Sequence, residues 1–278
     1  VDLPLTLLGL FPRRACVIQD KKHVAADAAA ASGWMKDFEW AVLNLTVGIG
    51  PFVEVAFYHR PTRTLLMTDA VFEIPKEPPA VCVEDPAPLL NRAKDQHKDD
   101  RPDTKVNRQV GWWKTIMFAI FFQPSSVEFD ISDAPTYLVW RDSHWLRVID
   151  SITSKLLVPP ILQVLVFTRG PQQVQEWVHD ICKWNFKRII PAHLVAPIDA
   201  RPRDLRRAFA YQPPGGDEGS RDYPSSELAA LDNLNAFLSR TGIAGTATPA
   251  GFTQTKPKRK KRNIPSNNKN KNNKVSLF

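Results

Sequence analysis

The sequence predicts an α/β fold with a mixed sheet, and two observations support this. Short apolar segments alternate with helical patterns between residues 164 and 211, and two β-rich runs at 52–58 and 64–69 are separated by a short turn. Strands that alternate with helices indicate layers of helix on sheet, and a hairpin adds an antiparallel pair. With 43% hydrophobic residues and 8 Trp, the chain also has ample material for a large core.

The hairpin consists of Phe-Val-Glu-Val-Ala-Phe-Tyr at 52–58 and Thr-Leu-Leu-Met-Thr-Asp at 64–69. Residues 59–63 contain a proline and form the predicted turn. We expect Tyr58 to face Thr64 across the pair. Apolar residues occur on both faces of each strand, so we expect the sheet to be covered on both sides.

The elements after the hairpin follow from composition and spacing. Residues 73–105 are rich in proline and charge, which predicts a long surface excursion. Apolar residues at helical spacing predict helices at 112–122 and 143–157. A βαβ-like unit is expected next, with a strand at 164–167, a helix from Pro171 to about residue 184 and a strand at 188–190, followed by a helix at 203–211.

We expect the main domain to end near residue 211. Residues 212–245 then form a linker and a C-terminal helix at 225–240, and residues 246–278 form a disordered tail, because this Thr-, Pro-, Lys- and Asn-rich stretch has too few apolar residues to fold. The predicted helix places four leucines on one side: Leu228, Leu231, Leu234 and Leu238.

The charge of the chain belongs to the tail. The whole sequence has a net charge of +8, but residues from Lys256 to Lys274 include nine Lys or Arg and no acidic residue, which leaves 28 basic against 29 acidic residues elsewhere. Such a cluster is typical of an import signal or a phosphate-contacting arm, so nucleic acid or an import receptor is the predicted partner. A solvated tail without a partner is the alternative.

Several other classes of protein are excluded. The cysteines Cys16, Cys82 and Cys182 are odd in number and never form a C-x-x-C pair, which argues against a disulfide framework or a zinc ribbon. No apolar run reaches the roughly 18–20 residues of a transmembrane span. The sequence contains neither a phosphate-binding loop nor a nucleophile elbow.

Two stretches resemble a known family. They are Glu-Val-Ala-Phe-Tyr-His-Arg-Pro-Thr-Arg-Thr-Leu-Leu-Met-Thr-Asp-Ala at 54–70 and Phe-Lys-Arg-Ile-Ile-Pro-Ala-His-Leu at 186–194. Both resemble the uncharacterised plant, algal and cyanobacterial family called domain of unknown function 4336, which is similar to the metallo-β-lactamase fold. The resemblance covers about residues 3–211. It implies a metallo-β-lactamase-like αββα sandwich and a chloroplast location, with the nucleus as the alternative that the tail indicates.

The same resemblance implies a metal site. Asp69 resembles the metal-bridging aspartate of the superfamily, and His193 resembles its last histidine ligand. A hydrolytic zinc or iron site usually needs three or more such ligands and an open position for water. The superfamily's H-x-H-x-D-H cluster has no counterpart among the six histidines. Because the chain opens with Val1 and is already apolar at 3–11, we expect the sandwich to be incomplete at its N-terminus.

Three functions remain open at this point. The first is a metal-dependent hydrolase with a degenerate or truncated metal site and an unknown substrate. The second is a non-catalytic plastid scaffold or interaction protein that binds no metal, and the third is nucleic-acid association through the tail. Structural interpretations of the two residues also remain open, with Asp69 capping backbone N–H groups and His193 serving in packing. His59 is expected to be a turn residue about 16 Å from Asp69.

Overall fold

The structure of the protein is a computed structural model that describes residues 33–48, 50–130, 137–210 and 225–244. The apolar residues 3–11, the linker at 212–224 and the basic cluster from Lys256 to Lys274 lie outside these ranges. What the sequence predicts for those segments therefore stays a prediction.

A four-stranded mixed sheet has the strand order β1-β2-β3-β8. β2 pairs antiparallel with both β1 and β3, and β3 pairs parallel with β8. The hairpin and the mixed sheet are therefore confirmed. The predicted register is wrong by one residue, since Tyr58 pairs with Leu65 and His59 with Thr64. The reason is that the strand continues through His59, so the turn is shorter than predicted. The four strands are β1 (Phe38–Thr46), β2 (Pro51–His59), β3 (Thr64–Leu66) and β8 (Arg188–Ile190).

The two faces of this sheet differ in exposure. Helix α7 (Pro171–Ile181) covers one face, where the Trp177 indole N–H donates to the Ala41 carbonyl at 3.1 Å. On the opposite face Val53 is 51% exposed and Phe57 is half-buried. Phe57 packs there against Phe38, with ring centroids 6.3 Å apart. The described residues thus cover the first face and leave side chains of the second partly exposed, and the covering of both faces stays a prediction.

The segment at 164–167 is helical, so the predicted strand and its βαβ unit are wrong. It belongs to α6 (Pro160–Leu165) and to the short 3-10 helix η3 (Phe167–Arg169). Proline is favoured at the first position of a helix, and Pro160 occupies that position. A run of four apolar residues fits a buried helix as well as a strand, so periodicity could not separate the two.

Residues 73–105 contain two helices, whereas composition predicted a long surface excursion. They are α2 (Ala80–Glu84) and α3 (Ala87–Ala93), and the side chains of Leu89 and Ala93 are buried. Helix α3 packs closely on α4 (Lys105–Phe121). α4 begins seven residues before its predicted start, because the Thr104 hydroxyl caps it by accepting from the Asn107 N–H.

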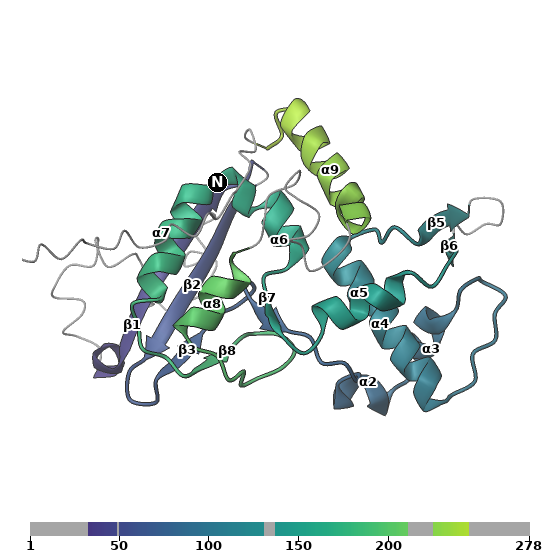
Figure 1. The fold of residues 1–278 in the computed structure, drawn as a ribbon, viewed down its shortest axis with the longest axis horizontal. Coiled ribbons are helices and arrows are strands. Elements are labelled where there is room, and N and C mark those ends of the chain that lie inside the picture. Colours follow the sequence, from purple (N-terminus) through teal and green to yellow (C-terminus); the bar gives the residue numbers. More distant parts are fainter. Residues whose placement is uncertain (1–32, 49, 131–136, 211–224, 245–278) are drawn as a thin grey trace, which may run out of the picture.

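A second hydrophobic cluster lies beside the sheet, where α4, α5 and the C-terminal helix α9 meet. Leu231 of α9 is completely buried, and the helix predicted at 225–240 is confirmed. Figure 1 shows the sheet and α7 in one half of the molecule and α3, α4 and α5 in the other. The remaining elements are η2 (Gly33–Asp37), β4 (Phe72–Glu73), β5 (Val127–Asp130), β6 (Tyr137–Trp140), α5 (Trp145–Ile152), β7 (Leu156–Leu157), α8 (Pro202–Ala208), η5 (Ser225–Leu228) and α9 (Ala229–Arg240).

None of the helices in the described ranges combines the length and the apolar character that membrane crossing requires.

Candidate functional site

The ends of β3 and β8 bring Asp69 and His193 together. Leu66 is the last residue of β3 and pairs with Ile190, the last residue of β8. The two strands run parallel, and each candidate residue lies three positions beyond its strand. Both loops therefore leave the same edge of the sheet side by side. Asp69 Oδ1 lies 2.9 Å from His193 Nε2, although 124 positions separate the two residues in sequence.

Glu54, in the middle of β2, fixes the Asp69 loop. Its side chain is completely buried. The carboxylate accepts hydrogen bonds from the Thr68 N–H at 2.7 Å, the Thr68 hydroxyl at 2.5 Å and the Asp69 N–H at 3.0 Å. Hydrogen bonds to an ionised carboxylate are among the stronger ones in proteins. Two of the three hold backbone groups, so they set the direction in which the loop presents Asp69.

Glu54 is absent from the site residues predicted from the sequence, although one signal indicates it. Glu54 is the only Asp, Glu, Lys or Arg in β2, and its neighbours from Phe52 to Phe57 are apolar. It lies on the same face as Tyr58, which belongs to the hydrophobic core under the sheet. A buried charge must be paired or well hydrogen-bonded. An acidic residue at an inward position of a strand therefore indicates that backbone or side-chain donors lie opposite it.

The His193 loop is held at both ends. Ile189 and Ile198 exchange backbone hydrogen bonds of 2.9 and 2.8 Å, which closes the loop. The Ala192 N–H donates to the Thr68 carbonyl at 3.4 Å, and this bond joins the His193 loop to the Asp69 loop. Leu194 has a φ of 68°, a conformation that bulky residues rarely adopt. The position of His193 is thus defined by backbone contacts on both sides.

The Asp69–His193 pair has the right chemistry for a divalent metal. A carboxylate oxygen and an imidazole nitrogen are donors that zinc accepts, and two ligands of one tetrahedral zinc lie about 3.4 Å apart. The observed separation of 2.9 Å is a hydrogen-bond distance, so the two side chains would move slightly apart to share an ion. Both side chains are more than half exposed, so a ligand in solvent can reach them. Within the described residues, however, no group of three or more His, Cys, Asp or Glu side chains could hold a metal ion.

The structure also places the other residues that the sequence singled out. His59 is the last residue of β2 and pairs with Thr64, so the prediction that it belongs to the turn is wrong; its Nδ1 lies 2.7 Å from the Thr62 hydroxyl. His179 is exposed on α7, and Trp112 is buried in the second cluster. Cys182 is buried as predicted, and burial raises the pKa of its thiol to about 11. At neutral pH this thiol is therefore protonated and poorly nucleophilic.

Comparison with known proteins gives a family but no function. No curated protein and no solved structure matches the chain. The family model described as "Domain of unknown function (DUF4336)" matches residues 1–211. Since that match spans well over half of the sequence, the chain belongs to the DUF4336 family.

Proposed function

We propose that this chain is a metallo-β-lactamase-like protein in which Asp69 and His193 form the carboxylate and imidazole part of a divalent-metal site used for hydrolysis. One observation carries the proposal: two metal-type ligands, distant in sequence, meet within 2.9 Å beyond the carboxyl ends of two parallel strands. In open α/β sheets, ligands bind at that edge. The two residues are also those that the family resemblance assigned to a metal.

The sheet supports the sandwich part of the proposal. One face is buried under α7, whereas the other carries apolar side chains that remain partly open, among them Val53, Val55 and Phe57. An αββα sandwich places a second sheet against such a face. That second layer, and the further ligands that a hydrolytic site needs, would come from residues outside the described ranges or from a further segment of the protein.

The residues present have distinct roles in this proposal. Asp69 and His193 would hold the ion, either zinc or iron, and Glu54 keeps the Asp69 loop in place from beneath. A bound divalent ion lowers the pKa of a coordinated water and supplies a hydroxide at neutral pH. The substrate classes that this chemistry fits are esters, thioesters and phosphoesters.

The test is a titration of the metal-free protein with Co²⁺ or Zn²⁺, followed by calorimetry and by the visible absorption of bound cobalt. We expect one ion per chain, and binding at least about tenfold weaker in Asp69→Asn and in His193→Gln. The matched control is His144→Gln, because His144 is also exposed beside an aspartate, Asp142, but at 3.8 Å. Hydrolysis of p-nitrophenyl acetate and bis(p-nitrophenyl) phosphate should follow the metal content.

Unchanged cobalt binding in both variants would contradict the proposal. If the wild-type protein binds no metal at all, the second candidate replaces the hydrolase, namely a non-catalytic plastid scaffold or interaction protein. The open apolar face of the sheet favours this candidate, since large exposed apolar patches often mark protein interaction sites. A chloroplast location is part of both proposals.

A further inference from the structure

A cavity of about 740 Å³ lies in the other half of the molecule, between α2, α3, α4 and β6. Its volume falls within the range of about 300–1,000 Å³ that small-molecule sites occupy. No residue of the Asp69–His193 pair lines it. The side chains that matter for its chemistry are Cys82, Leu89, Arg92, Trp112, Phe118 and Trp140.

Aromatic side chains form much of the cavity wall, and contacts with neighbouring groups hold them in place. The Trp112 indole N–H donates to the Pro75 carbonyl at 2.9 Å. Trp140 packs edge-on against Phe118, with centroids 5.6 Å apart. The buried Lys114 ammonium lies 4.9 Å from the Trp140 ring centroid. A planar ring can therefore enter the cavity without displacing a hydrogen bond of these side chains.

Lys114 itself is fixed, which makes the wall behind Trp140 rigid. Its ammonium donates to the Ala93 carbonyl at 3.1 Å, to the Lys94 carbonyl at 2.9 Å and to Asp95 Oδ1 at 2.5 Å. Burial is the largest influence on this group and lowers the pKa of Lys114, while Asp95 opposes that effect. Because its donors are already used, Lys114 supports the cavity and does not bind the ligand.

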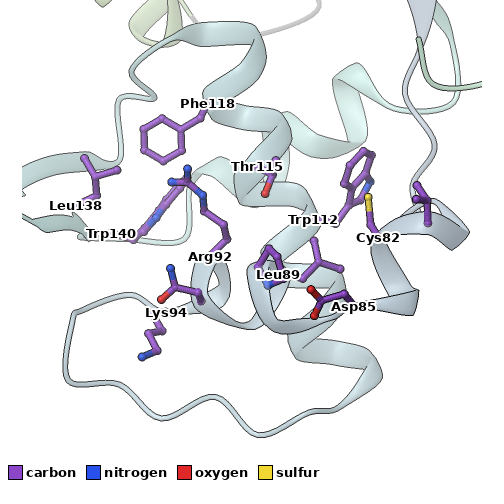
Figure 2. A pocket seen from close by; sticks show the side chains of 13 residues that line it. Cys82, Asp85, Leu89, Arg92, Lys94, Trp112, Thr115, Phe118, Leu138 and Trp140 are labelled. Carbon is purple, nitrogen blue, oxygen red and sulfur yellow. The ribbon is translucent and has the colours of Figure 1, made fainter.

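Arg92 is the cation available to a ligand. Its guanidinium lies 5.6 Å from the Phe118 ring centroid, and in the part of the chain that the structure describes no carboxylate forms an ion pair with it. Figure 2 shows Arg92 reaching among the aromatic side chains, whereas Lys94 extends the other way. Asp85 is the acidic lining residue, and its carboxylate accepts the Ala87 N–H at 3.2 Å. The Arg92 end of the cavity is therefore positively charged.

We propose that this cavity binds a small planar aromatic anion, with its ring against Trp140 and Trp112 and its acidic group on Arg92. A guanidinium presents five N–H donors in one plane and binds carboxylates, sulfonates and phosphates in a bidentate manner. The adjacent aromatic rings exclude water from one side of that contact. This site goes beyond the proposed hydrolase function and does not depend on it.

The first test uses two fluorescent probes of nearly equal shape, 8-anilinonaphthalene-1-sulfonate and its neutral analogue N-phenyl-1-naphthylamine. We expect the wild-type protein to bind the anionic probe more tightly. Arg92→Gln should weaken binding of the anionic probe about five- to tenfold, because only the charge contact is lost. The affinity for the neutral probe should stay nearly unchanged. Arg147→Gln is the matched control, since Arg147 is an exposed arginine outside the cavity.

The second test locates the probe. Cys82 lines the cavity and is half-buried, so its alkylation by N-ethylmaleimide should slow several-fold when the anionic probe is bound. Peptide mass spectrometry follows Cys82 separately from the other cysteines. Thr115→Trp, which fills the cavity from α4, should abolish this protection of Cys82 by the probe. The melting temperature of the variant reports whether it still folds.

Three kinds of result would contradict the proposed anion site. Equal binding of both probes by the wild-type protein, or unchanged anion binding in Arg92→Gln, would overturn the role of Arg92. An anionic probe that binds Thr115→Trp normally and does not protect Cys82 would show that it occupies another surface. Absence of binding by the folded wild-type protein would overturn the site itself.

Discussion

Glu54 contributes to the candidate site without being available to a ligand. It is completely buried, and its partners are the hydroxyl and backbone donors of the loop that carries Asp69. Asp69 and His193 in contrast are exposed and contact each other. At this site the residue that fixes the geometry and the residues that meet solvent are therefore different.

Replacing Glu54 by Gln should separate these two roles. An amide offers one acceptor oxygen in place of two, and its NH₂ group would face a backbone N–H. We expect a loss of about 2–4 kcal/mol in the free energy of unfolding, measured in urea. Metal affinity should also fall, although both proposed ligands remain. If stability and affinity are both unchanged, the Asp69 loop does not depend on Glu54.

The prediction of the site depended on more than periodicity. Asp69 and His193 were identified through the resemblance of two motifs, whereas composition and spacing alone gave no reason to bring them together. The parallel pairing of β3 with β8 does so. That pairing was missed because the strand expected at 164–167 offered β8 a nearer partner. Glu54 was missed because one charge in an apolar strand is ordinarily assigned to the solvent face.

At the level of elements, the contact between α3 and α4 depends on a single missing side chain. A Cβ atom at Gly111 of α4 would lie 1.9 Å from the Leu89 carbonyl oxygen of α3. The two helices approach so closely only because residue 111 is glycine. This contact also forms one side of the cavity, since Leu89 lines it.

Gly111→Ala should therefore destabilise the protein. Alanine favours a helix over glycine by about 1 kcal/mol, but overpacking costs about 1–3 kcal/mol and more where the clash is with backbone, as it is at Gly111. We expect the clash to outweigh the gain in helix propensity, so the free energy of unfolding should fall by about 1–3 kcal/mol. Gly33→Ala is the control, because a Cβ there meets nothing within 4 Å. Equal stability of the two variants would mean that α3 can move away at no cost.

The elements that could be predicted are those with strong local signals. The hairpin, α7, β8 and the C-terminal helix follow from alternation, proline position and leucine spacing. β1 was missed, since Phe38–Thr46 is apolar on both faces and lacks a clear period of two. α3 was missed because Pro86 precedes it and Pro88 lies in its first turn, and its burial depends on Gly111 of a different helix.

For the whole molecule, the C-terminal helix α9 is part of the folded body although it lies beyond the family match. Leu228 and Leu231 enter the second hydrophobic cluster. The Glu227 carboxylate accepts from the Ser125 N–H at 3.0 Å and from its hydroxyl at 2.6 Å. Arg169 of η3 donates to the Ser239 hydroxyl at 3.0 Å. Apolar and polar contacts thus join η5 and α9 to segments from both halves of the molecule.

Leu231→Ala tests this integration. Removing a completely buried leucine should lower the unfolding free energy by about 2–4 kcal/mol, through lost burial and the cavity left behind. Leu234→Ala, on the same helix but only partly buried, should cost clearly less. Urea unfolding followed by tryptophan fluorescence measures both. If Leu231→Ala costs less than about 0.5 kcal/mol, α9 is a detachable appendage.

The parallel pairing of β3 with β8 also has a consequence during synthesis. A ribosome adds about 5–20 residues per second, so the 124 positions between Asp69 and His193 correspond to roughly 6–25 s. Throughout that interval one edge of β3 has no partner from its own chain, and an unpaired strand edge can associate with other chains. A chaperone that binds the nascent chain would therefore be most useful after β3 has emerged and before β8 follows.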